Sequence, residues 1–249
     1  MNLEGGPRGP TEDRTAKQTL EPTEAATGTA RPRRASVALG ILGGTFNPVH
    51  LAHLRLAEVA RETLDLDAVC FIPAAQPPLK PAGVAPAAAR LEMVALATAS
   101  NPNFQVLDLE LERSGPSYTV DTLEALRALA PERPLWFLLG SDALVDLESW
   151  HRPERLFELA HFGVAARDGD ERPLDELLPR RLAAAFDRGP HGLVHRATGH
   201  EIRKFPFSAL AISASDIRAR VASGRSIRYL VPEGVIEYIN KHGLYTEVA

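Results

Sequence analysis

The sequence predicts an α/β protein with a doubly wound, mostly parallel sheet. Short, almost continuous apolar runs, typical of buried parallel strands, alternate with segments whose apolar residues recur at helical spacing. The chain has 249 residues, 45% of them hydrophobic and 24% charged, which is sufficient for a substantial core. A single cysteine, Cys70, excludes an intrachain disulfide framework. It lies in the apolar run AVCFIPA, so we expect a buried, unreactive thiol.

Residues 1–36 differ in composition from the rest of the chain. They contain no aromatic residue and no periodic apolar pattern, and they are rich in Gly, Pro, Thr and charge. We expect a disordered tail at 1–36, without the apolar segment of a secretory signal, and a folded domain at 37–249. The net charge of −4 argues against a nucleic-acid-coating surface, and no stretch approaches the roughly 18 apolar residues of a membrane span. These features favour a cytoplasmic protein.

The first half of this domain is expected to form three strands separated by helices. The apolar runs at 37–44 and 68–74 predict buried strands, and 104–112 predicts a strand that alternates towards its end. Between them, apolar residues at helical spacing predict helices at 51–65 and 86–100, the second with a proline near its first turn.

The second half continues this alternation and ends in helices. The tripeptide SYT offers helix N-cap oxygens, PLWFLLG is a further buried run, and Gly243 suits the C-cap of the last helix. The expected elements are a helix at 117–130, a strand at 134–144, a helix at 153–160, a strand at 161–167, one or two strands within 193–207, and helices at 213–224 and 231–243.

The segment GGTFNPVH, residues 43–50, lies where the first strand ends and the first helix begins. Its glycines let backbone N–H groups approach an anion, and a helix N-terminus adds about half a positive charge. His50 and His53 are three residues apart and share one face if the helix begins near Pro48. Two histidines without a HExxH or a cysteine cluster are too few for a zinc site. The pattern favours a phosphate site, although it is neither a P-loop nor a GxGxxG motif.

Two end motifs carry a family resemblance. GGTFNPVHLAHL resembles the T/HxGH motif of the nucleotidyltransferase superfamily, and ISASDIR, from Ile212, resembles its carboxyl-terminal ISxTxIR motif. SYTVDTL, LLGSDAL…W and the ending VPEGVIEYINKHGLY are similar to segments of one branch, the bacterial nicotinate-nucleotide adenylyltransferases. The resemblance covers about 37–245 and implies a Rossmann-like nucleotidyltransferase fold with a small C-terminal helical segment.

The chain departs from the family pattern at three positions. Ala52 stands where the family has glycine, Ser215 replaces the threonine of ISxTxIR and keeps its hydroxyl, and Leu79 replaces the histidine of PPHK. None of these changes removes a hydrogen-bonding group from the two end motifs.

The resemblance implies adenylyl transfer from ATP to nicotinate mononucleotide, which gives nicotinate adenine dinucleotide and pyrophosphate in NAD biosynthesis. The attacking phosphate is already an anion, so the site must position two polyanions and stabilise spreading charge. Mg²⁺ is expected to be held mainly by the ATP phosphates and water. ATP and nicotinate mononucleotide are then the partners, with no nucleic acid and no membrane.

The resemblance also implies roles for individual residues. The catalytic group is His50, His53 and Arg218. The ATP-binding group is Gly43, Gly44, Thr45, Phe46, Gly140, Asp142, Ser213, Ser215 and Lys80. The mononucleotide-binding group is Tyr118, Thr119, Trp150 and His151.

Several of these residues also have ordinary structural interpretations. Ser213 suits a plain helix N-cap, Asp142 a cap of the following helix, Trp150 a core residue and Lys80 a solvated lysine. Arg167 matches a family arginine, but Asp168 replaces the proline that should follow it, and no role is assigned.

Four other functions remain open at this point. One is a transferase that prefers nicotinamide mononucleotide or accepts both mononucleotides, and another is a phosphopantetheine transferase, which the middle segments argue against. The third is a fragment of a class I aminoacyl-tRNA synthetase, although no KMSKS-like loop is visible. The last is a nucleotide-binding regulator without catalysis, which the intact end motifs argue against. Release of pyrophosphate separates the last function from the transferases.

Overall fold

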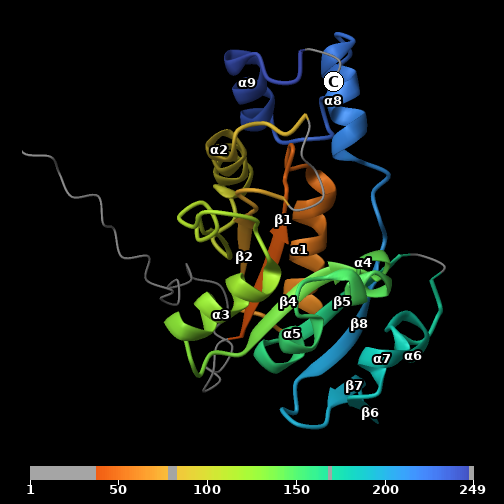
Figure 1. Ribbon diagram of the computed structural model, residues 1–249. Coiled ribbons are helices and arrows are strands. Elements are labelled where there is room, and N and C mark those ends of the chain that lie inside the picture. Colours follow the sequence, from red (N-terminus) through yellow and green to blue (C-terminus); the bar gives the residue numbers. More distant parts are fainter. Residues whose placement is uncertain (1–37, 78–82, 168–169, 247–249) are drawn as a thin grey trace, which may run out of the picture.

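The computed structural model describes residues 38–77, 83–167 and 170–246. The expectations for the tail at 1–36, for Leu79 and for Lys80 concern residues outside these ranges. Figure 1 shows the described part as a central sheet with helices around it.

One eight-stranded sheet runs through the described residues, in the order β3-β2-β1-β4-β5-β8-β7-β6. The strands from β3 to β8 in this order are parallel, and β7 and β6 add an antiparallel edge. The bounds are β1 (Leu39–Gly44), β2 (Ala68–Pro73), β3 (Phe104–Val106), β4 (Leu135–Gly140), β5 (His161–Arg167), β6 (Phe186–Gly189), β7 (Gly192–His195) and β8 (Glu201–Phe207). The chain order reverses between β1 and β4, which is where open α/β sheets bind ligands.

Helices connect these strands. They are α1 (Leu51–Thr63), α2 (Ala87–Thr98), α3 (Thr119–Leu129), α4 (Ser141–Val145), α5 (Pro153–Leu159), α6 (Leu174–Leu177), α7 (Arg180–Ala183), α8 (Ala214–Ala222) and α9 (Glu233–His242), with a 3₁₀ turn at Leu147–Ser149. In Figure 1, α8 and α9 lie together beyond the upper end of β1, and the β6–β7 hairpin lies at the opposite end of the molecule.

Both faces of the sheet are buried, and successive residues of a strand pack on opposite faces. In β1, Ile41 belongs to the core cluster that includes residues of α3 and α5, whereas Leu42 belongs to the cluster that includes residues of α1, α2 and α9. This arrangement confirms the predicted doubly wound, mostly parallel fold. No helix of the described residues is long and apolar enough to span a bilayer.

Two predicted strands need correction. The strand expected at 104–112 ends at Val106, because the chain turns at Asp108–Leu111 and Glu110 bonds to Thr122 on α3. The expected strand at 134–144 ends at Gly140, and α4 follows directly. The region 193–207 holds two strands, β7 and β8, as the expectation of one or two strands allowed, and the short strand β6 was not predicted.

Candidate active site

The segment 43–50 forms the turn between β1 and α1, at the carboxyl end of the sheet. Phe46 is buried and adopts a φ of 47°, and its ring lies against Gly44. A Cβ atom added at Gly44 would come within 3.2 Å of Phe46 Cζ. The second glycine therefore leaves room for the aromatic ring, and the backbone of the turn stays free of a side chain at this point.

The two histidines of the turn stack on each other. Their ring centroids are 3.7 Å apart, with 24° between the ring planes. The condition for a shared helical face, a helix that begins near Pro48, is not met, because α1 begins at Leu51 and His50 is its N-cap. The backbone N–H of His50 donates to Nδ1 of His53 at 3.2 Å. Since Nδ1 accepts, neutral His53 carries its proton on Nε2 and presents an N–H donor there.

His50 is a neutral side chain with an unused polar atom. It is 6% exposed, and burial lowers its pKa to about 4. Its side chain faces the first turn of α1, but it makes no side-chain cap hydrogen bond, and its Nδ1 is buried without a partner among the described residues. An unpaired buried nitrogen is costly, and such atoms in a site commonly await a ligand or water.

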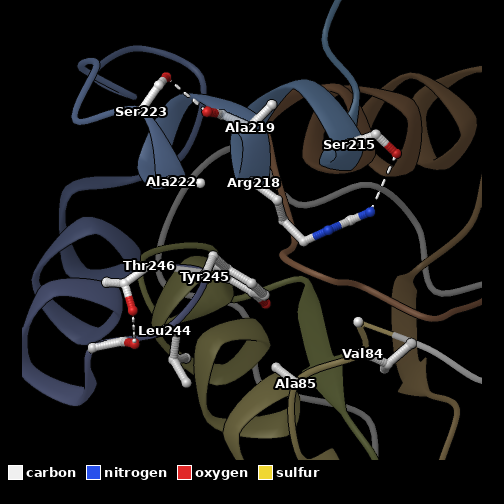
Figure 2. A pocket seen from close by; sticks show the side chains of 12 residues that line it. Val84, Ala85, Ser215, Arg218, Ala219, Ala222, Ser223, Leu244, Tyr245 and Thr246 are labelled. Carbon is white, nitrogen blue, oxygen red and sulfur yellow. Dashed lines mark hydrogen bonds between the residues drawn. The ribbon is translucent and has the colours of Figure 1, made fainter. Parts of the chain in front are cut away.

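The carboxyl-terminal motif forms the start of α8. Ser213 is its N-cap, as expected, and its Oγ accepts from the backbone N–H of Asp216 at 3.1 Å. Arg218 on the same helix donates from Nη2 to Ser215 Oγ at 3.4 Å (Figure 2) and from Nη1 to the backbone carbonyl of Asn47 at 2.8 Å. The second bond connects the two end motifs directly.

Asn47 forms hydrogen bonds to several segments around the turn. It is 6% exposed, and its Nδ2 donates to the Gly83 carbonyl at 3.0 Å. Its Oδ1 accepts from the backbone N–H of Ala85 at 3.0 Å and from the hydroxyl of Tyr245 at 2.8 Å. The turn after β1 is therefore tied to the segment before α2 and to the carboxyl-terminal segment.

Arg90 is a supporting residue that the sequence analysis missed. It is 1% exposed, and it donates to the backbone carbonyls of Thr45 at 2.7 Å, Ala85 at 2.9 Å and Ala75 at 3.1 Å. The guanidinium thus joins the turn after β1 to both described ends of the connection between β2 and α2. The available signal was an arginine inside the apolar helical segment AAARLEMVALA.

A second group of predicted residues gathers around the start of α3. Tyr118 is the N-cap of this helix, and its ring lies 4.4 Å from that of His151. Trp150 packs partly on the core, and its ring meets Phe137 edge-on at 6.1 Å. Thr119 is the first helical residue, so its amide belongs to the first turn of a helix, where N–H groups have no helical acceptor.

Buried polar contacts fix this region as well. Glu110 is 6% exposed and accepts from the Thr122 hydroxyl at 2.6 Å, and burial raises its pKa. Ser117 Oγ accepts from the backbone N–H groups of Ala75 and Gln76 at 3.0 and 3.2 Å. The segment that follows β2 is therefore connected to the start of α3.

The remaining predicted residues lie at the ends of neighbouring strands. Gly140 ends β4 and is the N-cap of α4, so the alternative that Asp142 caps this helix is wrong; Asp142 lies in its first turn. Arg167 ends β5.

Cys70 is fully buried, and burial raises its pKa to about 12, as expected for an unreactive thiol. No group of three or more His, Cys, Asp and Glu side chains in the described ranges is placed to hold a metal ion.

Comparisons with known proteins show what the chain is similar to. Residues 41–220 match the family model described as Cytidylyltransferase-like. A probable nicotinate-nucleotide adenylyltransferase of Syntrophotalea carbinolica is 50% identical over 213 residues, which cover 83% of this chain and 96% of that protein. A protein of the same description from Thermomicrobium roseum is 46% identical over 211 residues, which cover 84% of this chain and 92% of that protein.

A solved structure shares the fold. The Plasmodium falciparum nicotinic acid mononucleotide adenylyltransferase complexed with NaAD aligns with a TM-score of 0.66 at 20% identity, covering 85% of this chain and 98% of that one.

Proposed function

The chain belongs to the nicotinate-nucleotide adenylyltransferases of the cytidylyltransferase-like family, and we propose that its site joins ATP to nicotinate mononucleotide. The observation that carries this proposal is the hydrogen bond from Arg218 to the Asn47 carbonyl. It brings the glycine-rich turn with its two histidines and the start of α8 into one site at the carboxyl end of the sheet.

The reaction forms one phosphorus–oxygen bond and breaks another. A phosphate oxygen of nicotinate mononucleotide attacks the α-phosphorus of ATP, and the bond from that phosphorus to the bridging oxygen of the β-phosphate breaks. The products are nicotinate adenine dinucleotide and pyrophosphate. Because the nucleophile is already an anion, the protein contributes positioning and hydrogen bonds to the charge that spreads over the α-phosphate and the leaving group.

The donors of the site suit this task. His53 presents its Nε2–H, since its Nδ1 already accepts from the backbone of His50. Backbone amides at 43–46 are proposed to meet phosphate oxygens next to the N-terminus of α1. Arg218 supplies a permanent charge, and the hydroxyls of Ser213 and Ser215 lie at the start of α8, where we place the β- and γ-phosphates.

The mononucleotide is proposed to bind towards α3. The amides at Thr119 and His151 would receive the carboxylate of the pyridine ring, with Trp150 and Tyr118 as aromatic neighbours. Gly140 and Asp142, at the end of β4 beside β1, are proposed to contact the adenosine of ATP.

Mg²⁺ fits this site as an ion that arrives with ATP. The groups placed above at the phosphates are mainly amides, imidazoles, hydroxyls and a guanidinium, which can donate hydrogen bonds to phosphate and do not include the carboxylates that Mg²⁺ prefers. Mg²⁺ commonly keeps several waters and binds through substrate phosphates, where it neutralises part of their charge. The role of this chain's own residues is to hold and orient the polyphosphate.

A substrate panel tests the proposal. The purified full-length protein is supplied with Mg²⁺ and either ATP or CTP, and with nicotinate mononucleotide, nicotinamide mononucleotide or phosphopantetheine. We expect release of pyrophosphate with ATP and nicotinate mononucleotide, together with an equal amount of nicotinate adenine dinucleotide. Transfer only from CTP, transfer only to phosphopantetheine, or binding of ATP without pyrophosphate release would overturn the proposal.

A further inference from the structure

Tyr245, near the carboxyl terminus, contacts Asn47 of the site, which lies 198 positions earlier in the sequence. Its hydroxyl donates to Oδ1 of Asn47 at 2.8 Å. The chain returns towards the sheet because α9 ends at Gly243 with a φ of 58°, and the N–H of Leu244 donates to the Ile239 carbonyl at 3.0 Å. Tyr245 itself has a φ of 64°, a conformation that is strained for a residue with a Cβ atom and persists where the surroundings hold it.

The contact lies beside a cavity that the proposed catalytic Arg218 also lines. A cavity of about 700 Å³ is lined by α8 residues, among them Ser215 and Arg218, by the carboxyl-terminal residues Leu244 and Tyr245, and by the segment before α2. Figure 2 shows α8 on one side of this cavity and the segment with Tyr245 on another.

Asn47 transmits this contact to Arg218. Its side chain is held by Tyr245, Ala85 and Gly83, and its own backbone carbonyl holds Arg218 at 2.8 Å. Fixing the Asn47 side chain fixes the residue, and with it the carbonyl that orients the guanidinium. Burial raises the pKa of Tyr245, so its hydroxyl keeps the proton that it donates.

We propose that Tyr245 is a positioning residue for adenylyl transfer, which acts through Asn47 on the orientation of Arg218. This inference rests on the proposed function. The Tyr245 hydroxyl donates to Asn47, so its removal should change turnover through Arg218 and leave binding of the mononucleotide almost unchanged.

Tyr245→Phe tests this role because it deletes one hydroxyl and keeps the ring. Loss of a single neutral hydrogen bond changes an equilibrium or rate constant by a factor of roughly 2 to 12. We expect kcat to fall by about 3- to 10-fold, with the KM for nicotinate mononucleotide within about twofold of wild type and a similar melting temperature. Tyr238→Phe is the matched control: it removes the hydroxyl of a tyrosine on α9 whose ring lies 4.2 Å from that of His242, and it should leave kcat unchanged.

A double-mutant cycle separates positioning from a general structural effect. If Tyr245 acts through Arg218, then Tyr245→Phe should cause no further loss of kcat in an Arg218→Ala background. Independent, multiplicative losses would overturn the inference, as would a Tyr245→Phe protein with wild-type kcat. A wild-type protein that releases no pyrophosphate in the same assay would overturn the proposed function as well, whereas an active wild type confines any failure to the role of Tyr245.

Discussion

The guanidinium of Arg218 donates to the backbone carbonyl of Asn47 at 2.8 Å, across 171 positions of the sequence. The two residues belong to the two end motifs, and the contact places the N-terminus of α8 beside the turn that precedes α1. One side chain, which donates separately to Asn47 and to Ser215, thus links both proposed anion-binding elements.

Loss of the Arg218 side chain should impair the use of ATP. We expect Arg218→Ala to lower kcat/KM for ATP by about 10²-fold, the order typical for one preorganised group that stabilises developing charge. Arg220→Ala on the same helix is the matched control, because this arginine pairs with Asp216 at the surface. Steady-state kinetics at varied ATP checks the prediction, and equal ATP kinetics in the wild type and Arg218→Ala would refute the assignment.

His53→Ala should reduce turnover without unfolding the protein. We assign its Nε2–H as one donor to the developing charge, so we expect kcat to fall by more than about 10²-fold. Arg55→Ala, an exposed position on the same helix, should retain wild-type turnover. The measurement is kcat together with a circular-dichroism melting curve. A folded His53→Ala protein with near-normal turnover would remove His53 from the mechanism.

Stability should fall below neutral pH because of buried histidines. Burial lowers the pKa of His161 to about 4, and neighbouring His200 adds to this shift. The ring stacks on Trp136 at 4.7 Å, and its Nδ1 accepts from the Glu201 backbone N–H at 3.0 Å. The unfolded state, with a histidine pKa near 6.5, binds the proton first as the pH falls. The stability that neutral His161 retains above about pH 6.5 is therefore lost progressively towards pH 4.

Urea unfolding at a series of pH values checks this dependence. We expect the free energy of unfolding to decrease from pH 7 to pH 4.5, with a contribution from His161 on the order of 2 kcal/mol. His161→Gln should be less stable at pH 7 and should show a smaller decrease. His242→Gln, at an exposed position of α9, should keep the wild-type decrease. Identical pH profiles for wild type and His161→Gln would contradict the assignment.

Much of the fold could be predicted because its elements have strong local patterns. The continuous apolar run of β1 and the helical spacing of α1 placed the turn at 43–50 at the end of a parallel strand. The N-cap Ser213 and the C-cap Gly243 marked one end each of the two last helices. The strand after α2 was predicted too long because alternation alone did not show that Glu110 turns inwards to Thr122.

The support of the site could not be predicted, because it depends on contacts between distant segments. Local spacing does not show that Arg90 reaches three backbone carbonyls, or that Tyr245 meets Asn47. Both contacts join loops whose relative positions arise only when the sheet and its helices assemble. The end motifs thus predict which groups meet the substrates, and the structure adds the groups that hold them.

The central claim, adenylyl transfer to nicotinate mononucleotide, is tested most directly by kinetics with both pyridine mononucleotides side by side. A carboxylate accepts hydrogen bonds at both oxygens, whereas the amide presents an NH₂ group to one of the proposed donors at Thr119 and His151. An unpaired buried donor costs about 1–3 kcal/mol, or roughly 5- to 150-fold. We predict formation of nicotinate adenine dinucleotide with kcat/KM at least about tenfold higher than for nicotinamide mononucleotide. Equal efficiencies, or a preference for the amide, would contradict the account.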